Sequence, residues 1–185
     1  MEDNTQRKLN RRHFLRLGAL TIAGAAIPGS ALAALRIARE RSLSFYNLHT
    51  GESLKTVYFA DGSYLPEGLT AINYLMRDFR LNLIKPIDPR LLDLLHSINL
   101  AMETRAPFDL ISGYRSPQTN AMLHANSEGV AVHSLHIDGM AADIRMPGRS
   151  LASLRRAAIA MRGGGVGYYP ASEFVHVDSG RVRYW

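Results

Sequence analysis

The segment Ser134-Leu135-His136-Ile137-Asp138-Gly139-Met140-Ala141-Ala142-Asp143 places a histidine and an aspartate seven positions apart, with a glycine between them. Gly139 permits a tight turn, because glycine adopts backbone conformations that other residues avoid. The small side chains at 141 and 142 let the backbone come close around a site. The run from 141 to 145 is typical of a short strand. This segment therefore predicts a turn and a strand that carry two metal-binding types of side chain.

A second segment, Phe174-Val175-His176-Val177-Asp178, carries a further histidine. His136, Asp143 and His176 would make a sensible zinc set, with two imidazoles, one carboxylate and a fourth position left for water. Bound zinc lowers the pKa of such a water to about 7. On spacing alone, a histidine of this kind is more often a hydrogen-bonded structural residue than a ligand, so both interpretations stay open.

The rest of the chain predicts short strands mixed with helices. Residues 43–49 and 53–59 alternate in polarity around a Thr-Gly-Glu turn, as the strands of a hairpin do. Apolar residues at helical spacing cover 67–80, and further helices are predicted to begin at Asp88-Pro89, Ser116-Pro117 and Ser150. Strands are predicted at 107–112, 141–145, 166–169 and 174–178. Such short strands, few of them joined by helical crossovers, favour a single α+β domain with a mostly antiparallel sheet flanked by helices.

The composition excludes several kinds of site and partner. The 185 residues contain no cysteine, which excludes disulfides, cysteine metal ligands, a thiol nucleophile and lipid attachment at an N-terminal cysteine. The formal net charge is +6, but residues 1–33 carry +3 of it, with five basic residues against Glu2 and Asp3. The remainder has no dense basic run, so we expect no nucleic-acid partner.

The N-terminal residues are organised like an export signal. Asn10-Arg11-Arg12-His13-Phe14-Leu15 precedes eleven weakly apolar residues, 17–27, and Ala31-Leu32-Ala33 offers the small residues that a signal peptidase reads. These eleven residues are too few to span a bilayer, which takes about 20. The alternative to an export signal is a membrane anchor or a buried N-terminal helix. The paired arginines resemble the twin-arginine export motif. We therefore expect a signal peptide over 1–33, one folded domain over 34–185, transient contact with the twin-arginine translocase, no stable membrane anchor after cleavage and a periplasmic location.

Several motifs resemble those of one group of peptidases. Ser134-x-His136-x-x-Gly139-x-Ala141-x-Asp143 is similar to the signature of the zinc D-Ala-D-Ala peptidases and LAS metallopeptidases, which share a fold with the hedgehog signalling domain. Residues 111–116 (ISGYRS) resemble the strand and turn of the same family. The closest likeness is to the murein endopeptidase K group, and it covers nearly the whole chain. It includes residues 47–52 (NLHTGE), 77–80 (RDFR), 164–170 (GGVGYYP) and 174–180 (FVHVDSG).

The resemblance implies one zinc ion per chain, with three ligands: His136, Asp143 and His176. It also implies that Arg115 binds the substrate and stabilises the oxyanion. Two residues remain candidates for the general base. Glu173 stands three residues before the last histidine ligand, as the catalytic glutamate of the D-Ala-D-Ala dipeptidases does. Asp178 stands two residues after that ligand, on the same face of the expected strand, and it is slightly favoured, either as the base or as a group that orients a ligand.

The function that this resemblance implies is a zinc metallo-endopeptidase that hydrolyses peptide cross-links of peptidoglycan (murein) during cell-wall remodelling. The alternatives are a D,D-carboxypeptidase or dipeptidase of the same fold, or a non-catalytic zinc-containing domain that binds the wall. The bond that is cut, between two diaminopimelates or between D-alanine and diaminopimelate, stays open. Away from the motif cluster, we expect His49 and His96 to be structural or exposed. We expect residues 181–185 to fold back and bury the indole of Trp185.

Overall fold

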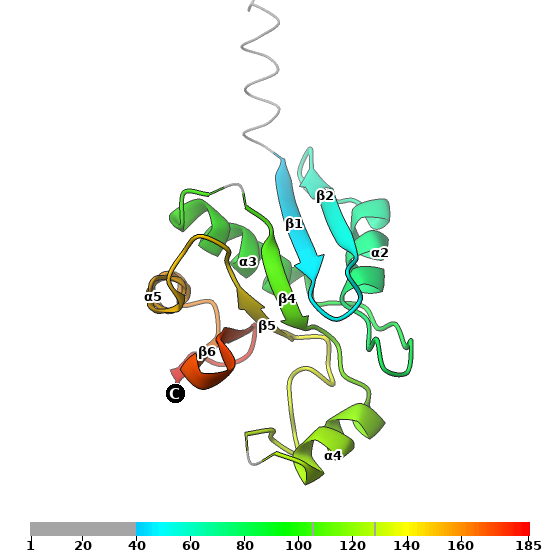
Figure 1. Ribbon diagram of the computed structural model, residues 1–185. Coiled ribbons are helices and arrows are strands. Elements are labelled where there is room, and N and C mark those ends of the chain that lie inside the picture. The colour runs from blue at the N-terminus through cyan, green and yellow to red at the C-terminus, as the bar shows by residue number, and fades with distance from the viewer. Residues whose placement is uncertain (1–39, 105, 128) are drawn as a thin grey trace, which may run out of the picture. The chain divides into compact units, whose positions relative to one another are not determined.

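The strands of this protein alternate apolar and polar side chains, so their sheet has one buried and one open face. The computed structural model describes residues 40–104, 106–127 and 129–185. Within these residues, eight strands form one sheet in the order β3-β2-β1-β4-β5-β7-β6-β8 (Figure 1). The strands are β1 (Arg41–Asn47), β2 (Ser53–Ala60), β3 (Ser63–Tyr64), β4 (Phe108–Ser112), β5 (Ala141–Arg145), β6 (Gly165–Tyr169), β7 (Phe174–Asp178) and β8 (Arg183–Tyr184).

The pairing of the strands confirms the predicted α+β fold with a mostly antiparallel sheet. β1 and β2 form the expected hairpin, and β5 pairs antiparallel with both β4 and β7. Two pairs are parallel: β1 with β4, and β6 with β8. The β1–β4 pair is parallel because the chain between the strands of that pair crosses over through two helices, α2 (Pro66–Leu75) and α3 (Pro89–Ala101).

Three helices cover the buried face of the sheet. α2, α3 and α5 (Leu151–Met161) contribute apolar side chains to a single core, while α4 (Pro117–Ala125) lies beyond the end of the sheet (Figure 1). β1, β4, β5 and β7 contribute every second residue to this core: Leu43, Phe45, Phe108, Leu110, Ala142, Ile144, Val175 and Val177. The residues between them point to the open face, so any chemistry carried by β5 and β7 lies on the side away from these helices.

The predicted helix starts are confirmed by their capping bonds. The Asp88 carboxylate accepts the backbone N–H of Arg90 at 3.0 Å. Ser116 Oγ accepts the N–H of Thr119 at 3.2 Å, and Ser150 Oγ caps α5 in the same way. Each cap satisfies a backbone donor that the first turn of a helix leaves without a partner.

One helix is shorter than predicted. Helical spacing continued to Phe79, but α2 ends at Leu75. Beyond it, the buried Asp78 carboxylate accepts the backbone N–H groups of Arg80 at 3.1 Å and of Ser116 at 2.9 Å, and residue 78 pairs through its backbone with Leu83. These bonds to a distant segment require an extended turn here, which outweighs the local helical pattern.

The expected signal peptide, residues 1–33, lies outside the described residues, so that assignment and the domain boundary after it stay predictions. In the part of the chain that the structure describes, no helix combines the length and the apolar character that crossing a membrane requires.

Candidate metal centre

The three expected ligands lie together on the open face of the sheet. His136 belongs to the turn before β5, Asp143 to β5 and His176 to β7. His136 Nε2 is 3.2 Å from both Asp143 Oδ1 and His176 Nδ1, and the last two atoms are 2.9 Å apart. Among the described residues, no other group of histidine and carboxylate side chains is arranged to hold a metal ion.

Strand pairing places two of these side chains. Asp143 is directly opposite His176 in the antiparallel register of β5 and β7. Since side chains alternate along a strand, Ala142 and Val177 enter the core while Asp143 and His176 share the open face. Opposite residues on one face have Cβ atoms about 4.5–5.5 Å apart, which suits two ligands of one ion.

A turn brings His136 to the same place. The N–H of Ile137 donates to Ser134 O at 2.9 Å, and the N–H of Gly139 donates to His136 O at 3.3 Å. Gly139 has a φ of +69°, and a Cβ there would lie 2.5 Å from the carbonyl oxygen of Pro86. Glycine is therefore required both for the turn and for its packing, as the sequence predicted.

Each histidine is held from its far side by a hydrogen-bond acceptor. His136 Nδ1 lies 2.7 Å from the carbonyl oxygen of Gly113, so Nδ1 carries the proton and Nε2 presents its lone pair. His176 Nε2 lies 3.1 Å from Asp178 Oδ2, which assigns the proton to Nε2 and turns Nδ1 towards His136 and Asp143. Metal-binding histidines are characteristically oriented through their second nitrogen in this way.

The electrostatics of the cluster favour the protonation states that a metal ion needs at His136 and Asp143, but favour the protonated form of His176. Burial lowers the pKa of His136 and so favours neutral imidazole. Burial alone would raise the pKa of Asp143, but the two histidines and the Arg115 guanidinium hold it well below its ordinary value. Burial opposes a charge on His176, yet hydrogen bonds with Asp143 and Asp178 raise its pKa. Binding of a cation to this set would release protons.

Arg115 lies beside the cluster and lines the same cavity. Its Nη2 donates to Asp143 Oδ2, the oxygen that faces away from the histidines, and its Nε donates to Ser112 Oγ at 2.8 Å. Its backbone N–H donates to His136 O at 3.2 Å. Among the described residues, Nη1 has no hydrogen-bond partner, so it can donate to a bound molecule. Arg115 thus holds the Asp143 carboxylate and keeps donors on the side of the cavity.

Asp178 lies beneath His176, away from the cavity, and its side chain is 0% exposed. Its Oδ1 accepts from the N–H groups of Gly165 and Gly180 and from Arg183 Nη1, at 2.9–3.0 Å. Its Oδ2 accepts from Arg183 Nη2 at 2.7 Å as well as from His176. Burial alone would raise the pKa of Asp178, but these hydrogen bonds hold it well below the ordinary value.

Glu173 lies outside the cavity. It follows the 3₁₀ turn η1 (Pro170–Ser172) with a φ of +55°, and its side chain is 77% exposed. Its Oε2 lies 3.4 Å from Arg145 Nη1.

A cavity of about 350 Å³ surrounds the cluster, and it includes side chains to which the sequence assigned no role. His49, expected to be structural or exposed, is exposed but lines this cavity. Arg80 and Arg183 line it too. The only signal for His49 and Arg80 was their place in the NLHTGE and RDFR segments of the family resemblance.

Trp185 also lines the cavity, so the expectation that its indole is buried is wrong. Residues 181–185 do fold back, through β8, but Trp185 remains 45% exposed. Its Nε1 donates to Tyr169 Oη at 2.8 Å, and its ring centroid lies 5.4 Å from that of His176. A Cβ at Gly167 would lie 2.7 Å from this ring. The indole therefore fills space above a glycine on the open face, where there is no core to cover it.

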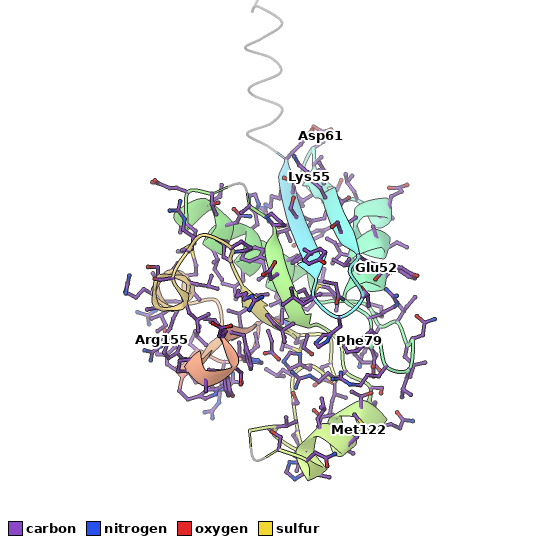
Figure 2. The ribbon with its side chains drawn as sticks, in the orientation of Figure 1. Glu52, Lys55, Asp61, Phe79, Met122 and Arg155 are labelled. Carbon is purple, nitrogen blue, oxygen red and sulfur yellow. The ribbon has the colours of Figure 1, made fainter. Side chains whose placement is uncertain are left out.

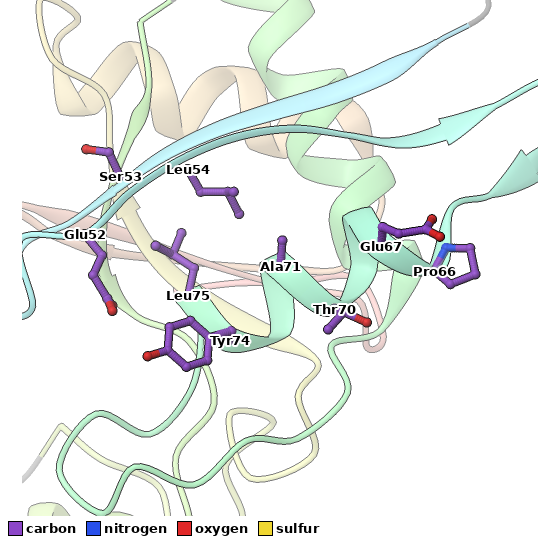
Figure 3. A pocket seen from close by; sticks show the side chains of 9 residues that line it. All are labelled: Glu52, Ser53, Leu54, Pro66, Glu67, Thr70, Ala71, Tyr74 and Leu75. Atoms are coloured by element: carbon purple, nitrogen blue, oxygen red, sulfur yellow. The ribbon is translucent and has the colours of Figure 1, made fainter.

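A second cavity, of about 710 Å³, lies between β2 and α2, away from the cluster (Figure 3). Its wall is mostly apolar, with Leu54, Ala71 and Leu75 pointing inward, and Glu52 and Glu67 lie at opposite ends. It contains no histidine, so it offers no comparable set of metal ligands.

Comparison with known proteins gives a consistent match along the chain. A family model described as peptidoglycan L,D-endopeptidase MepK matches residues 36–185. The chain is 48% identical over 176 residues to the peptidoglycan L,D-endopeptidase MepK of Escherichia coli K12, covering 95% of this chain and 97% of that protein, and the Shigella flexneri protein of that name gives the same values. A probable peptidoglycan L,D-endopeptidase MepK of Haemophilus influenzae is 41% identical over 177 residues, covering 95% of each chain.

Proposed function

We propose that this chain, which belongs to the peptidoglycan L,D-endopeptidase MepK family, is a zinc-dependent endopeptidase and cuts peptide cross-links of peptidoglycan. Membership in this family makes the chain a peptidase and therefore a hydrolase. The observation that carries the metal-dependent part is the convergence of His136 Nε2, Asp143 Oδ1 and His176 Nδ1, all within 4.8 Å of one another.

Zinc fits this set of donors. Two imidazole nitrogens and one carboxylate oxygen are a common set in catalytic zinc sites, which keep a further position open. When bound, zinc would supply a Lewis acid that polarises the scissile carbonyl and makes water acidic enough to attack near neutral pH. Other first-row divalent ions accept the same donors, so metal analysis is part of the test.

The chain's own groups would position the ligands and stabilise charge. The Gly113 carbonyl and the Asp178 carboxylate fix the two ring tautomers, and Arg115 fixes the orientation of Asp143. The free N–H groups of Arg115 Nη1 would stabilise the negative charge that develops on the carbonyl oxygen as the amide is attacked.

The two candidate bases differ in what their surroundings allow. Asp178 has five short contacts from donors on its two oxygens and no surface towards the cavity, so we propose that it orients His176 rather than accepting a proton from water. Glu173 is exposed and paired with Arg145; it would have to turn inward to act. Apart from the ligands, the histidines that line the cavity are His49 and His133.

The names of the relatives specify an L,D-endopeptidase, so we propose that the bond cut joins two diaminopimelates. A D,D-carboxypeptidase, a dipeptidase and a cross-link between D-alanine and diaminopimelate are the alternatives. We also propose export through the twin-arginine route and action in the periplasm. This rests on Arg11-Arg12 with the apolar residues 17–27, and on a family match that begins at residue 36, just after the small residues 31–33. A fusion of residues 1–40 to a folded reporter, with Arg11 and Arg12 changed to lysine as the control, would test the export signal.

Digestion of purified peptidoglycan sacculi tests the activity. The mature protein, its His176→Ala variant and a chelator-treated sample with and without added zinc would be compared, and the products separated by chromatography. His96→Ala is the matched control, since His96 lies outside the cavity and contacts the carbonyl of Ser42. Metal content would be measured on the same preparations.

We expect dimers joined by two diaminopimelates to disappear with the wild type and the His96→Ala variant. They should remain with the His176→Ala variant and with the chelator-treated protein, and adding zinc to the chelator-treated protein should restore their cleavage. Loss of only the D-alanine-linked dimers would reassign the bond. If fully metallated protein left every dimer intact, the proposed function would be refuted.

A further inference from the structure

Three arginines line the cavity around the cluster, and they differ in how they are paired. Arg115 donates to Asp143, and Arg183 donates to Asp178 at 2.7 Å. Arg80 is exposed and, within residues 40–104, 106–127 and 129–185, it has no carboxylate within 4.0 Å. Arg80 is therefore the one arginine of the cavity whose charge is not paired with a carboxylate in the described part of the chain.

The backbone at Arg80 is anchored. Asp78 is 2% exposed, and its carboxylate accepts the N–H of Arg80 and, through its other oxygen, the N–H of Ser116 at the start of α4. This ties the loop after α2 to the segment that carries Arg115. A side chain on such a backbone loses less freedom when it binds a ligand than one on a free loop.

An aromatic pair supports the guanidinium. The Arg80 guanidinium carbon lies 4.4 Å from the centroid of the Phe79 ring, and the same ring stacks on His49 with centroids 4.4 Å apart and an interplanar angle of 17°. Figure 2 shows Phe79 beside the turn that joins β1 to β2. Partial desolvation and the charge of Arg80 lower the pKa of His49, which favours its neutral imidazole.

The neighbouring arginine of the RDFR segment shows the contrast. Arg77 pairs with Glu52 at 2.9 Å, and its side chain is 10% exposed. That ion pair joins the loop to the β1–β2 turn and leaves no charge for a ligand. One arginine of this segment thus holds the fold, and the other faces the cavity.

We propose that Arg80 binds a carboxylate of the peptide stem and makes the enzyme select stems with a free acid over stems with an amide at that position. This rests on the proposed function for its substrate class. In a cross-link between two diaminopimelates, the residue that supplies the amide nitrogen keeps a free carboxylate on the same carbon. A guanidinium donates two parallel hydrogen bonds to a carboxylate but meets a repelling N–H₂ group on a carboxamide.

Two synthetic cross-linked peptides would test this, one with a free carboxylate on the amine-donating diaminopimelate and one with a carboxamide there. KM and kcat would be measured for the wild type and for the variants Arg80→Gln, Arg80→Lys and Arg156→Gln. Calorimetry on the same zinc-loaded proteins would then measure their affinity for the cleaved fragment, in its acid and its amide form. Arg156 is a matched control, because it is exposed on α5 and lies outside the cavity.

We expect Arg80→Gln to raise KM for the acid about tenfold with kcat unchanged, and to weaken fragment binding by a similar factor, since the carboxylate is bound alike before and during reaction. KM for the amide should not change, and Arg80→Lys should lie between. Equal effects on acid and amide, or none, would overturn the proposal. If the wild type bound the acid fragment but cut neither peptide, the proposed function would fail while the fragment affinities still decided the role of Arg80.

Discussion

Asp178→Asn separates two roles for a buried carboxylate: orientation of His176 and acceptance of a proton. The substitution keeps the shape of the side chain and replaces one oxygen by an N–H₂ group. In the orientation that keeps the three contacts of Oδ1, the new amide faces His176 Nε2 and Arg183 Nη2. An amide donor there requires an unprotonated Nε2, so the proton moves to Nδ1 of His176, which is the atom that would bind the metal.

The expected magnitude follows from these contacts. Removing an outer partner of a metal ligand costs about 10–100-fold in metal affinity, and the tautomer change places this variant at the upper end. Breaking a buried charge pair costs about 3–5 kcal/mol of unfolding free energy. The cost is smaller for the Asp178–Arg183 pair, because the Arg183 side chain is 32% exposed. We therefore expect a loss of about 2 kcal/mol in the metal-free protein.

Competition with a chromophoric chelator measures the zinc affinity, and urea unfolding measures the stability. Asp109→Asn is the control, since Asp109 pairs with Arg145 at 3.0 Å outside the cluster; it should lose some stability and keep its zinc affinity. At saturating zinc, Asp178→Asn should retain kcat within about tenfold. Unchanged zinc affinity with a kcat lowered by about 10²–10⁴, the usual effect of losing a general base, would refute the orienting role.

Further substitutions and conditions test the other parts of the structure. Glu173→Gln should leave kcat/KM within about twofold, because the side chain is exposed and outside the cavity; a loss of a hundredfold or more in peptide hydrolysis would restore it as the base. Gly164→Ala should destabilise the fold by about 3 kcal/mol in urea unfolding, because its Cβ would overlap the Asp178 carbonyl oxygen; Gly167→Ala, where only the indole of Trp185 must move, should cost about 1 kcal/mol, and equal losses would contradict this packing. The pKa of Asp178 is depressed in the folded state, so its ionised form stabilises the fold above the unfolded value of about 4, and this contribution is lost as pH falls through the lower folded value. The stability gap between metal-free wild type and Asp178→Asn should therefore shrink below about pH 4, and a constant gap would rule this out. Zinc at a hundredfold excess over its Kd should add about 2.7 kcal/mol to the unfolding free energy, which chelation in a thermal melt would remove.

The parts of the fold that were predictable from the sequence depend on neighbours along the chain. Helix caps at Asp88, Ser116 and Ser150 act within three residues, and alternation in β7 is a property of five consecutive residues. The same local rule predicted that His176 and Asp178 share a face. For the candidate ligand set, local rules were insufficient, and the family resemblance supplied what spacing could not.

The parts that were missed depend on segments far apart in the sequence. The end of α2 is decided by a bond from Asp78 to Ser116, 38 positions away, which no helical pattern contains. The enclosure of Asp178 comes from Gly165 and Arg183 on two other strands, so the pattern could place its side chain but not reveal that its acceptors are occupied. The exposure of Trp185 likewise follows from the strand order, which puts β6 and β8 at the edge of the open face.

The contact between Trp185 and His176 also makes the chain its own optical probe. Trp185 is the single tryptophan of the sequence, and its ring centroid lies 5.4 Å from that of His176. Indole emission is quenched by a nearby imidazolium and responds to its loss, so the fluorescence of the unlabelled protein should report whether that ring is protonated, neutral or ligated. Because no second indole contributes background, a titration followed at one emission band would read this single position rather than an average over the molecule.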